Sequence, residues 1–232
     1  MHIPDGYLGP QTYIPLYGAF IAAAGVAVKK VRHAVAARNI PYLGMAAAFS
    51  FLIMMFNLPV PGGTSGHAVG SAVIAILFGP WAAVIAVSVA LIIQALLFGD
   101  GGITTLGANC FNMAVFMPFF SYYTFKLLCR KSEKKKMVFS AAFIAGYAGL
   151  VMTSVLTATE FGIQPYIATS PEGKALYCPY DLKIAIPAMA IEHLLLFGIV
   201  EGLITATVVR YFMSSEPGLV YAFRKENGNE TK

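Results

Sequence analysis

The sequence predicts an all-α integral membrane protein whose 232 residues form a single transmembrane bundle. Hydrophobic residues make up 58% of the chain and charged residues only 12%, whereas roughly a quarter of the residues are charged in an ordinary soluble domain. The mean hydropathy is +0.70. Nearly the whole chain also divides into apolar stretches that are long enough, or almost long enough, to cross a bilayer. We therefore expect a multi-pass protein of the cell's inner (plasma) membrane with no soluble domain.

Seven apolar stretches are the predicted transmembrane helices. The first contains Gly18, Gly25 and many alanines, which is typical of helices that pack closely in lipid. The third has only 12 residues, so a helix there rises about 18 Å against a hydrocarbon core of about 30 Å, and we expect it to start within the membrane. The seven-helix core is predicted at 13–213, between an extracellular N-terminus, 1–12, and a cytoplasmic tail, 214–232. In chain order the helices are expected at 13–31, 41–58, 67–78, 81–98, 106–126, 137–159 and 184–211.

The basic residues predict the orientation, because short loops rich in lysine and arginine stay in the cytoplasm. Only Lys174 and Lys183 fall in the loops on the other side, together with most of the loop acids. The remaining 14 of the 16 basic residues follow the first, fifth and seventh stretches: Lys29, Lys30, Arg32, Arg38, Lys126, Arg130, Lys131, Lys134, Lys135, Lys136, Arg210, Arg224, Lys225 and Lys232. The N-terminus is thus expected outside and the C-terminus inside. The net charge of +5 is a topology signal, and no basic stripe interleaved with aromatics indicates nucleic acid.

The first two residues, Met1 and His2, form a candidate metal chelator. The terminal amine, the His2 amide nitrogen and the His2 imidazole can bind one ion through fused five- and six-membered rings, which place the three donors close to one plane. One further ligand completes the square-planar or tetragonal nitrogen field that Ni(II) and Cu(II) favour, and His67 is our candidate for it. His2 alone is also compatible with chance. The first dozen residues lack the basic leader and apolar run of a secretory signal, so Met1 is expected to be the mature terminus.

The predicted topology places His67 on the same side of the membrane as Met1. The segment 59–66 before it is expected to dip inward as irregular backbone, which is tolerated at that depth only where protein covers it or a watery cavity lines it. The positive N-terminal end of the third helix opposes a cation by roughly 0.3 to 1 kcal/mol. Direct coordination, worth on the order of ten kcal/mol, exceeds this cost. Because the amine and the amide give up protons, metal binding is predicted to depend on pH.

Several polar residues near the outer face are candidates to orient the metal-binding imidazoles, which usually donate their second nitrogen to an oxygen. Asp5 and Asn109 are equally plausible as loop or helix caps. The stretch 99–102 is interpreted as a flexible gate or a plain turn. The candidates for this second layer are Asp5, Thr64, Ser65, Asp100, Asn109 and Asn112.

These motifs together resemble the CbiM/NikM family, the cobalt- and nickel-specific substrate-capture (S) components of energy-coupling factor (ECF) transporters. The resemblance runs in order over residues 1–113 and rests on the opening Met-His-Ile-Pro-Asp-Gly, the stretch 60–67, the Phe-Gly-Pro-Trp turn at 78–81, the stretch 94–102, and the segments 107–109 and 111–113. The later apolar stretches agree in number and character.

The resemblance implies a seven-helix subunit with one helix added at the N-terminus of a six-helix plan. It also implies that the transported Ni²⁺ or Co²⁺ is bound by the Met1 amine, the His2 amide and imidazole, and His67. The implied partners are a membrane coupling protein and a pair of cytoplasmic ATPases, with a small accessory membrane subunit that this sequence does not contain. Nickel is narrowly preferred over cobalt, while affinity order alone would place copper first.

A stand-alone, proton-coupled metal transporter is the alternative, because ionisable groups inside a membrane are functional candidates. Glu192, His193 and Glu201 lie in the seventh stretch and would form the relay, although helical geometry does not place all three on one line. The other interpretation is that they satisfy polar groups within the bundle or at a partner interface. The short tail leaves little room for the output domain of a metal-sensing receptor.

No catalytic motif is apparent, so we expect a protein that is not an enzyme and has no catalytic cofactor. There is no phosphate-binding loop for ATP hydrolysis and no His-Glu-x-x-His zinc motif. Cys110, Cys129 and Cys178 are too widely spaced for a Cys-x-x-Cys site. His33 lies among inner-side basic residues and is excluded from the metal site.

Overall fold

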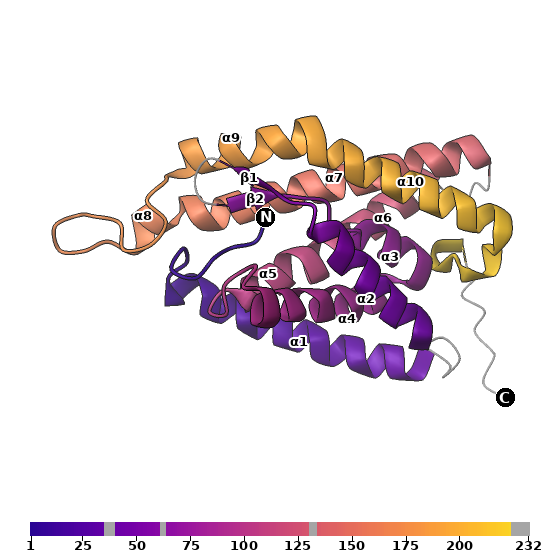
Figure 1. The fold of residues 1–232 in the computed structure, drawn as a ribbon, viewed down its shortest axis with the longest axis horizontal. Coiled ribbons are helices and arrows are strands. Elements are labelled where there is room, and N and C mark those ends of the chain that lie inside the picture. Colours follow the sequence, from indigo (N-terminus) through magenta and orange to yellow (C-terminus); the bar gives the residue numbers. More distant parts are fainter. Residues whose placement is uncertain (35–39, 61–63, 130–133, 224–232) are drawn as a thin grey trace.

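The computed structural model describes residues 1–34, 40–60, 64–129 and 134–223, which form a helical bundle (Figure 1). Within these ranges the helices join into seven rods, one at each apolar stretch of the sequence. Three rods contain a π-helical turn, at η2, η3 or η4. The rods are α1 (Pro10–Ala34), α2 (Ile40–Met54), α3 (Ser71–Phe78), α4 (Pro80–Ile93) with η2 (Gln94–Phe98), α5 (Leu106–Cys110) with η3 (Phe111–Phe116) and α6 (Met117–Cys129), α7 (Lys135–Gly162), and α9 (Leu182–Glu192) with η4 (His193–Phe197) and α10 (Gly198–Ser215).

Helix length and composition qualify four segments of the described chain to cross a membrane: Pro10–Arg32, Pro80–Phe98, Lys135–Ile167 and Leu182–Ser215. The apolar helix α2 has 15 residues and α3 only 8. The chain is therefore a helical protein with several membrane-spanning helices. Seven complete crossings remain a prediction.

Two predicted helix limits are wrong because the local backbone ends one helix earlier and starts the other later than hydropathy indicates. The second helix was expected to reach residue 58, but α2 ends at Met54 and the chain then forms the antiparallel strands β1 (Leu58–Val60) and β2 (Thr64–Gly66). The described part of the 59–66 segment is thus a strand pair and not irregular backbone. The third helix was expected to begin at His67 but begins at Ser71, because Gly70 adopts a left-handed φ of 74° and caps it.

Short elements complete the two ends of the bundle. The single-turn helix α8 (Gln164–Ile167) follows α7, and an isolated bridge joins Thr169 to Ala175 in the loop that leads to α9. After α10 the chain continues through the 3-10 turns η5 (Pro217–Leu219) and η6 (Tyr221–Phe223). Tyr221 packs over Gly79, so this end of the chain lies against the far end of α3 from the His67 turn.

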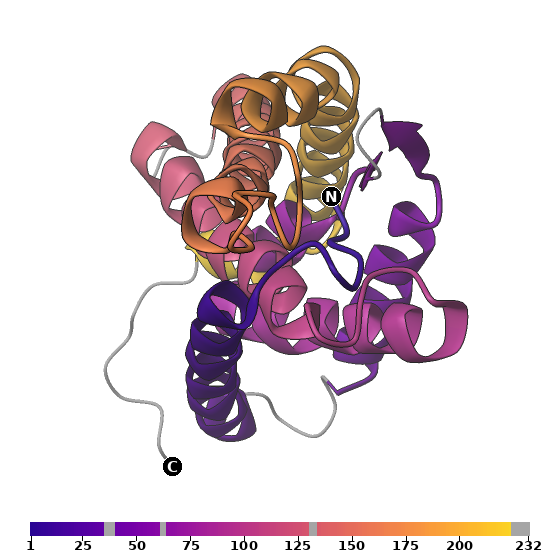
Figure 2. The same ribbon diagram turned by 90° about the vertical axis from the view of Figure 1, so that its left-hand side faces the viewer.

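The core surrounds α3, whose residues Ser71 to Leu77 are all buried. The segment before α1 does not stay at the rim but runs back between the helices, so residue 1 lies near the middle of the bundle (Figures 1 and 2). Gly18 and Gly25 do not mediate close packing as predicted, since a Cβ at either would meet nothing within 4 Å. Close approach to α1 occurs instead at Gly107, where a Cβ would lie 2.3 Å from Tyr17 Cγ.

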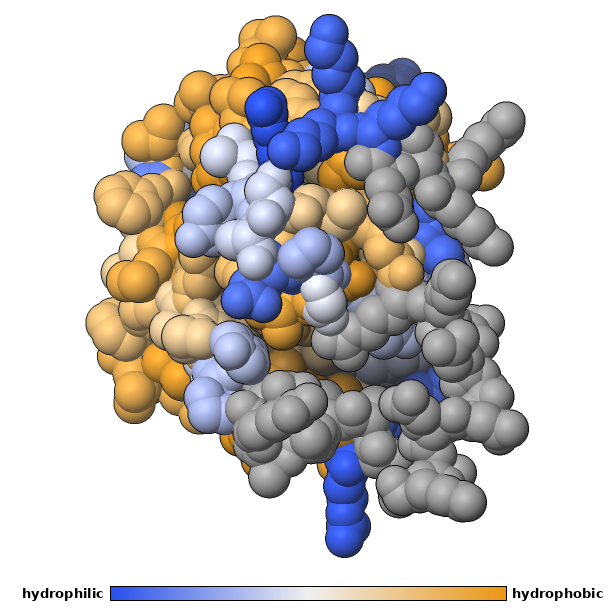
Figure 3. All heavy atoms as spheres, turned by 90° about the vertical axis from the view of Figure 1, so that its right-hand side faces the viewer, coloured by the Kyte–Doolittle hydropathy of each residue, from blue (hydrophilic) through white to orange (hydrophobic). Residues whose placement is uncertain are grey.

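Charged side chains gather at one end of the bundle (Figure 3). At the described ends of α1, α6, α7 and α10, the exposed basic residues are Lys29, Lys30, Arg32, Lys126, Lys134, Lys135, Lys136 and Arg210. The remaining basic residues predicted for this side, including Arg38 and Arg224, lie outside the described residues, as does the side chain of His33. Lys174 and Lys183 belong to the opposite end, with the loop between α8 and α9. This separation is the basis of the predicted orientation.

Candidate metal site

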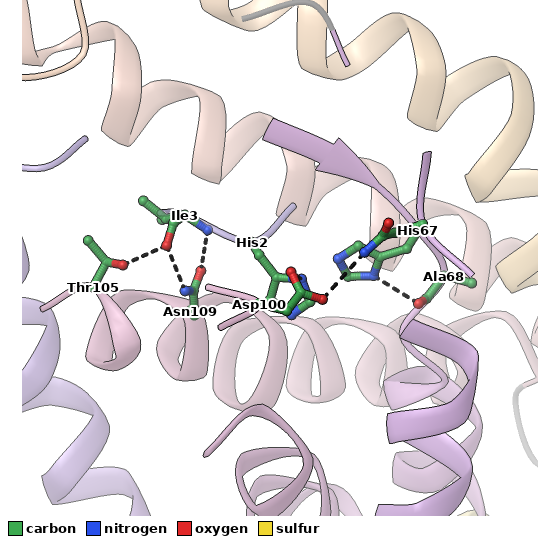
Figure 4. A network of polar contacts seen from close by, with 8 residues as sticks. His2, Ile3, His67, Ala68, Asp100, Thr105 and Asn109 are labelled. Atoms are coloured by element: carbon green, nitrogen blue, oxygen red, sulfur yellow. Dashed lines mark hydrogen bonds and ion pairs between the residues drawn. The ribbon is translucent and has the colours of Figure 1, made fainter. Parts of the chain in front are cut away.

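The first three residues form a buried segment without regular secondary structure, which is held through the main chain of Ile3 (Figure 4). The Ile3 N–H donates to Asn109 Oδ1 at 2.8 Å. The Ile3 carbonyl accepts from Thr105 Oγ1 at 2.6 Å, from the Gly102 N–H at 2.8 Å and from Asn109 Nδ2 at 3.1 Å. Met1 and Ile3 are 0% exposed and His2 is 4% exposed. The loop 99–105 and α5 thus fix the path of the chain directly after His2.

Asp5 is a second anchor of this segment, through the loop at residues 103 and 104. Its carboxylate accepts from the N–H of Ile103 at 3.1 Å and from the N–H and hydroxyl of Thr104 at 2.8 and 2.5 Å. Partial burial raises the pKa of Asp5, but the hydrogen bonds from Thr104 and Ile103 outweigh it and hold this pKa below its ordinary value. Asp5 therefore positions the N-terminal segment.

Residues 7–9, which lead into α1, are held by hydrogen bonds to α8 and to the loop before α9. The Gly9 N–H donates to Gln164 Oε1 at 2.9 Å, and Gln164 Nε2 donates to Thr12 Oγ1 at 3.0 Å. The Tyr7 carbonyl accepts from the Cys178 N–H at 3.2 Å. Residues 1–12 are thus attached to the bundle at several points.

His2 and His67 meet in the centre of the bundle. Their rings stack with centroids 4.5 Å apart and an interplanar angle of 23°. His67 is 0% exposed, and its Nδ1 lies 3.0 Å from the carbonyl oxygen of Ala68. Because a carbonyl only accepts, this contact places the His67 proton on Nδ1 and leaves the lone pair on Nε2. Nε2 is buried and has no hydrogen-bond partner among the described residues, so it is free to ligate a metal.

Asp100 contacts the other histidine. Its Oδ1 lies 3.2 Å from His2 Nδ1, and its Oδ2 accepts from Asn57 Nδ2 at 3.3 Å. Burial raises the pKa of Asp100, but the hydrogen bond and charge of His2 lower it by a larger amount. The pKa of Asp100 therefore lies below its ordinary value. Nδ1 is the ring nitrogen that closes a six-membered chelate with the His2 amide, so chelation must exchange the Asp100 contact for the metal.

Burial also changes the chemistry of the terminal amine. It lowers the pKa of the Met1 amine from 8.0 to about 5, against the opposing influence of the Glu192 and Asp100 carboxylates. Glu192 lies at the end of α9, close to the strand pair: a Cβ on Gly66 would meet Glu192 Oε1 at 2.7 Å. An amine with this pKa is neutral at pH 7 and presents a lone pair, as a metal ligand must.

The three ionisable residues of the seventh stretch have different surroundings. His193 Nδ1 lies 2.7 Å from the Met189 carbonyl and 3.1 Å from Glu192 Oε1. Glu201 is fully buried, and its Oε2 accepts from the N–H groups of Val69 and Gly70 at 2.8 and 2.9 Å. Glu192 thus lies beside Gly66 and acts on the Met1 amine, whereas Glu201 lies beside the main chain of Val69 and Gly70. These positions were missed, because contacts across more than a hundred residues leave no local pattern.

The other predicted second-layer residues lie at different distances from the histidines. Asn109 acts on Ile3. Asn112 donates to Thr157 Oγ1 at 3.2 Å and Glu160 Oε2 at 2.9 Å, on α7. Ser65 joins His2, Pro4, Asn57, Pro59 and Asp100 in lining a cavity of about 300 Å³ that gives access to the His2 side chain. The Thr64 side chain lies outside the described residues.

Side chains alone do not form a metal cluster. Among the residues that the structure describes, no three His, Cys, Asp or Glu side chains are grouped to hold an ion. The groups that do lie together are the two imidazoles of His2 and His67, which stack beside the start of the chain. This arrangement differs from an ordinary zinc site, in which side chains supply the ligands.

Comparison with known proteins gives concordant matches. The CbiM family, described as "Cobalt uptake substrate-specific transmembrane region", matches residues 2–219. The fused nickel transport protein NikMN of Rhodobacter capsulatus is 46% identical over 222 residues, which are 95% of this chain but only 64% of that protein. The cobalt transport protein CbiM of Lachnoclostridium phytofermentans is 35% identical over 217 residues, 88% of this chain and 82% of that protein. The crystal structure of a truncated transition metal transporter superposes with a TM-score of 0.89 at 45% identity, covering 93% of this chain and 99% of that one.

Proposed function

The chain belongs to the CbiM family of cobalt and nickel transport proteins, and from this premise we propose that it captures Ni²⁺ or Co²⁺ with four nitrogens: the Met1 amine, the His2 amide and imidazole, and His67 Nε2. The metal is the transported substrate, and as a member of a transporter family the chain is a multi-pass membrane protein and not an enzyme. The stacking of His2 on His67, with centroids 4.5 Å apart, is the observation that carries the proposal.

The state of each donor supports this ligand set. The Met1 amine is neutral at pH 7, and His67 Nε2 has its lone pair free. Chelation then requires loss of the His2 amide proton and release of Nδ1 from Asp100. Three donors from two adjacent residues fix one plane and leave one position for His67. This planar nitrogen field favours Ni(II) over metals that prefer oxygen ligands, and nickel remains our narrow preference over cobalt.

We further propose that the chain is the S component of an ECF importer in the inner membrane. It would act with a membrane coupling protein, a cytoplasmic ATPase pair and a small accessory membrane subunit. The exposed lysines and arginines at one end of the bundle support a cytoplasmic location for that end, and hence an outward-facing site, with residues 1–12 outside, seven crossings over 13–213 and the tail 214–232 inside.

Extension of the N-terminus tests the chelate directly. Two glycines added before Met1 turn its amine into an amide and place the new amine too far from His2 to complete the same set of fused rings; a single glycine would instead create Gly-Met-His, itself a planar four-nitrogen chelator. The matched control carries two glycines after Lys232, at the other terminus. Intact mass must first show that Met1 carries a free amine without a formyl group. We expect the control to bind Ni(II) as the unmodified chain does, as a yellow, diamagnetic species, and the extended chain to lose at least 100-fold in affinity. Equal affinities for both would refute the chelate.

Transport assays separate the S component from the stand-alone transporter. In liposomes containing only the purified chain, we expect metal binding without uptake, because no motor is present. Uptake driven by a pH gradient without ATPases would show that the chain transports alone. The ECF assignment would then be wrong, while the metal site would stand.

A further inference from the structure

The turn that carries His67 is held by a carboxylate from a distant helix. Glu201 Oε2 accepts from the N–H groups of Val69 and Gly70, at 2.8 and 2.9 Å, across 132 and 131 residues of sequence. These two amides lie between His67 and the first residue of α3. Glu201 is fully buried, so water does not compete for its oxygens.

The same turn is fastened on its opposite side. Ser50 Oγ, from α2, donates to the Val69 carbonyl at 2.8 Å. Gly70 has a φ of 74°, and a Cβ there would lie 2.8 Å from a ring carbon of Phe49. The His67 ring is in turn fixed to this backbone by its Nδ1 contact with the Ala68 carbonyl. The position of His67 Nε2 therefore follows the position of the turn.

Glu201 also supplies what the sequence around α3 lacks. The first N–H groups of a helix have no partner within the helix and are ordinarily capped by a side chain of the preceding residue. Here that residue is Gly70, which has no side chain, and no local cap is formed.

We propose that Glu201 is a positioning residue of the metal site: by accepting from the Val69 and Gly70 amides, it holds His67 Nε2 where the N-terminal chelate needs its fourth nitrogen. This inference rests on the proposed function. It gives Glu201 a fixed role as an acceptor for main-chain amides, in place of the proton relay considered from the sequence.

Two substitutions in the full-length protein distinguish the effect of the length of the Glu201 side chain from the effect of its charge. Glu201→Gln keeps an acceptor oxygen at the same distance from the backbone, whereas Glu201→Asp keeps the carboxylate but withdraws it by one methylene. Thr205→Val is the matched control, because Thr205 lies one turn further along α10, is fully buried, and its Oγ1 has no hydrogen-bond partner among the described residues. The readouts are the absorption spectrum of bound Ni(II) and its dissociation constant by chelator competition.

We expect Glu201→Gln and Thr205→Val to keep the wild-type spectrum, with dissociation constants within about threefold of wild type. Glu201→Asp is expected to raise the constant at least tenfold and to shift the spectrum to that of His67→Ala, since the fourth nitrogen is displaced. An Asp variant with the wild-type spectrum, a Gln variant as defective as Asp, or an equal defect in Thr205→Val would each overturn the inference.

Measurements on the wild type and on His67→Ala show whether a result bears on the proposed function or only on the role of Glu201. A wild-type protein without a four-nitrogen spectrum, or one that His67→Ala leaves unchanged, would refute the proposed function and this inference with it. A wild-type spectrum that is lost in His67→Ala but kept in Glu201→Asp would refute the role of Glu201 alone.

Discussion

Asn109→Ala should increase the population of molecules in which the N-terminal segment, residues 1–5, has left the bundle. The structure allows the size of this increase to be worked out. Asn109 is 2% exposed and serves both main-chain groups of Ile3. After truncation the Ile3 carbonyl still accepts from Thr105 and Gly102, but the buried Ile3 N–H loses its acceptor. An unsatisfied buried donor costs about 1–3 kcal/mol. Since about 1.4 kcal/mol corresponds to a factor of ten, the released population should increase about 5- to 150-fold.

Chemical labelling of the Met1 amine measures this population in the metal-free protein. The buried amine reacts only when the N-terminal segment leaves the bundle. The rate of its reductive methylation is therefore proportional to the released fraction, and mass spectrometry of the N-terminal peptide measures this rate. Asn112→Ala is the matched control: it removes another buried asparagine, whose partners lie on α7. We expect the control to label at the wild-type rate. If Asn109→Ala also labelled at that rate while remaining folded, Asn109 would not be an anchor.

Two further predictions concern the same N-terminal segment. Gly102→Ala should expel it and abolish metal binding, because the new Cβ would lie 2.4 Å from the Asp5 nitrogen; Gly18→Ala, with open space around it, should bind as wild type, and calorimetric titration compares the two. Proton release should also reveal the buried amine. With an amine pKa of about 5, only the His2 amide proton leaves at pH 7, so about one proton is released per metal, rising toward two as the pH falls through 5. An amine of ordinary pKa, 8.0, would release about two at pH 7, and titration in weakly buffered solution counts them.

Hydropathy predicted the helical rods well, because most of them are long apolar runs, which is what a membrane environment requires. It did not predict where α2 ends and α3 begins. Strands of three residues, β1 and β2, are too short for a periodic signal, and the start of α3 depends on a left-handed glycine. The small residues of α1 were misinterpreted, since Gly18 and Gly25 face open space and Tyr17 makes the close contact.

The candidate site was partly foreseeable. His2 and His67 could be placed on one side of the membrane from charge distribution, and the structure brings them into contact. Asp100 was among the proposed neighbours, and its contact with His2 agrees with that role. The roles of Glu192 and Glu201 could not be read from the sequence, because their partners lie at residues 1 and 67–70. Only the tertiary packing of α9 and α10 places them there.

The fastening of residues 1–9 has a consequence for the order of events during synthesis. Ile3 is joined to Asn109 across 106 residues and Gly9 to Gln164 across 155 residues, while Tyr7 accepts from Cys178. Closing such long loops costs chain entropy, and the contacts that compensate for it exist only once the later helices have packed. Residues 1–9 are thus expected to dock only after the later helices have packed. A nascent or truncated chain lacks the packed helices that these residues contact, so metal binding would indicate that folding is complete.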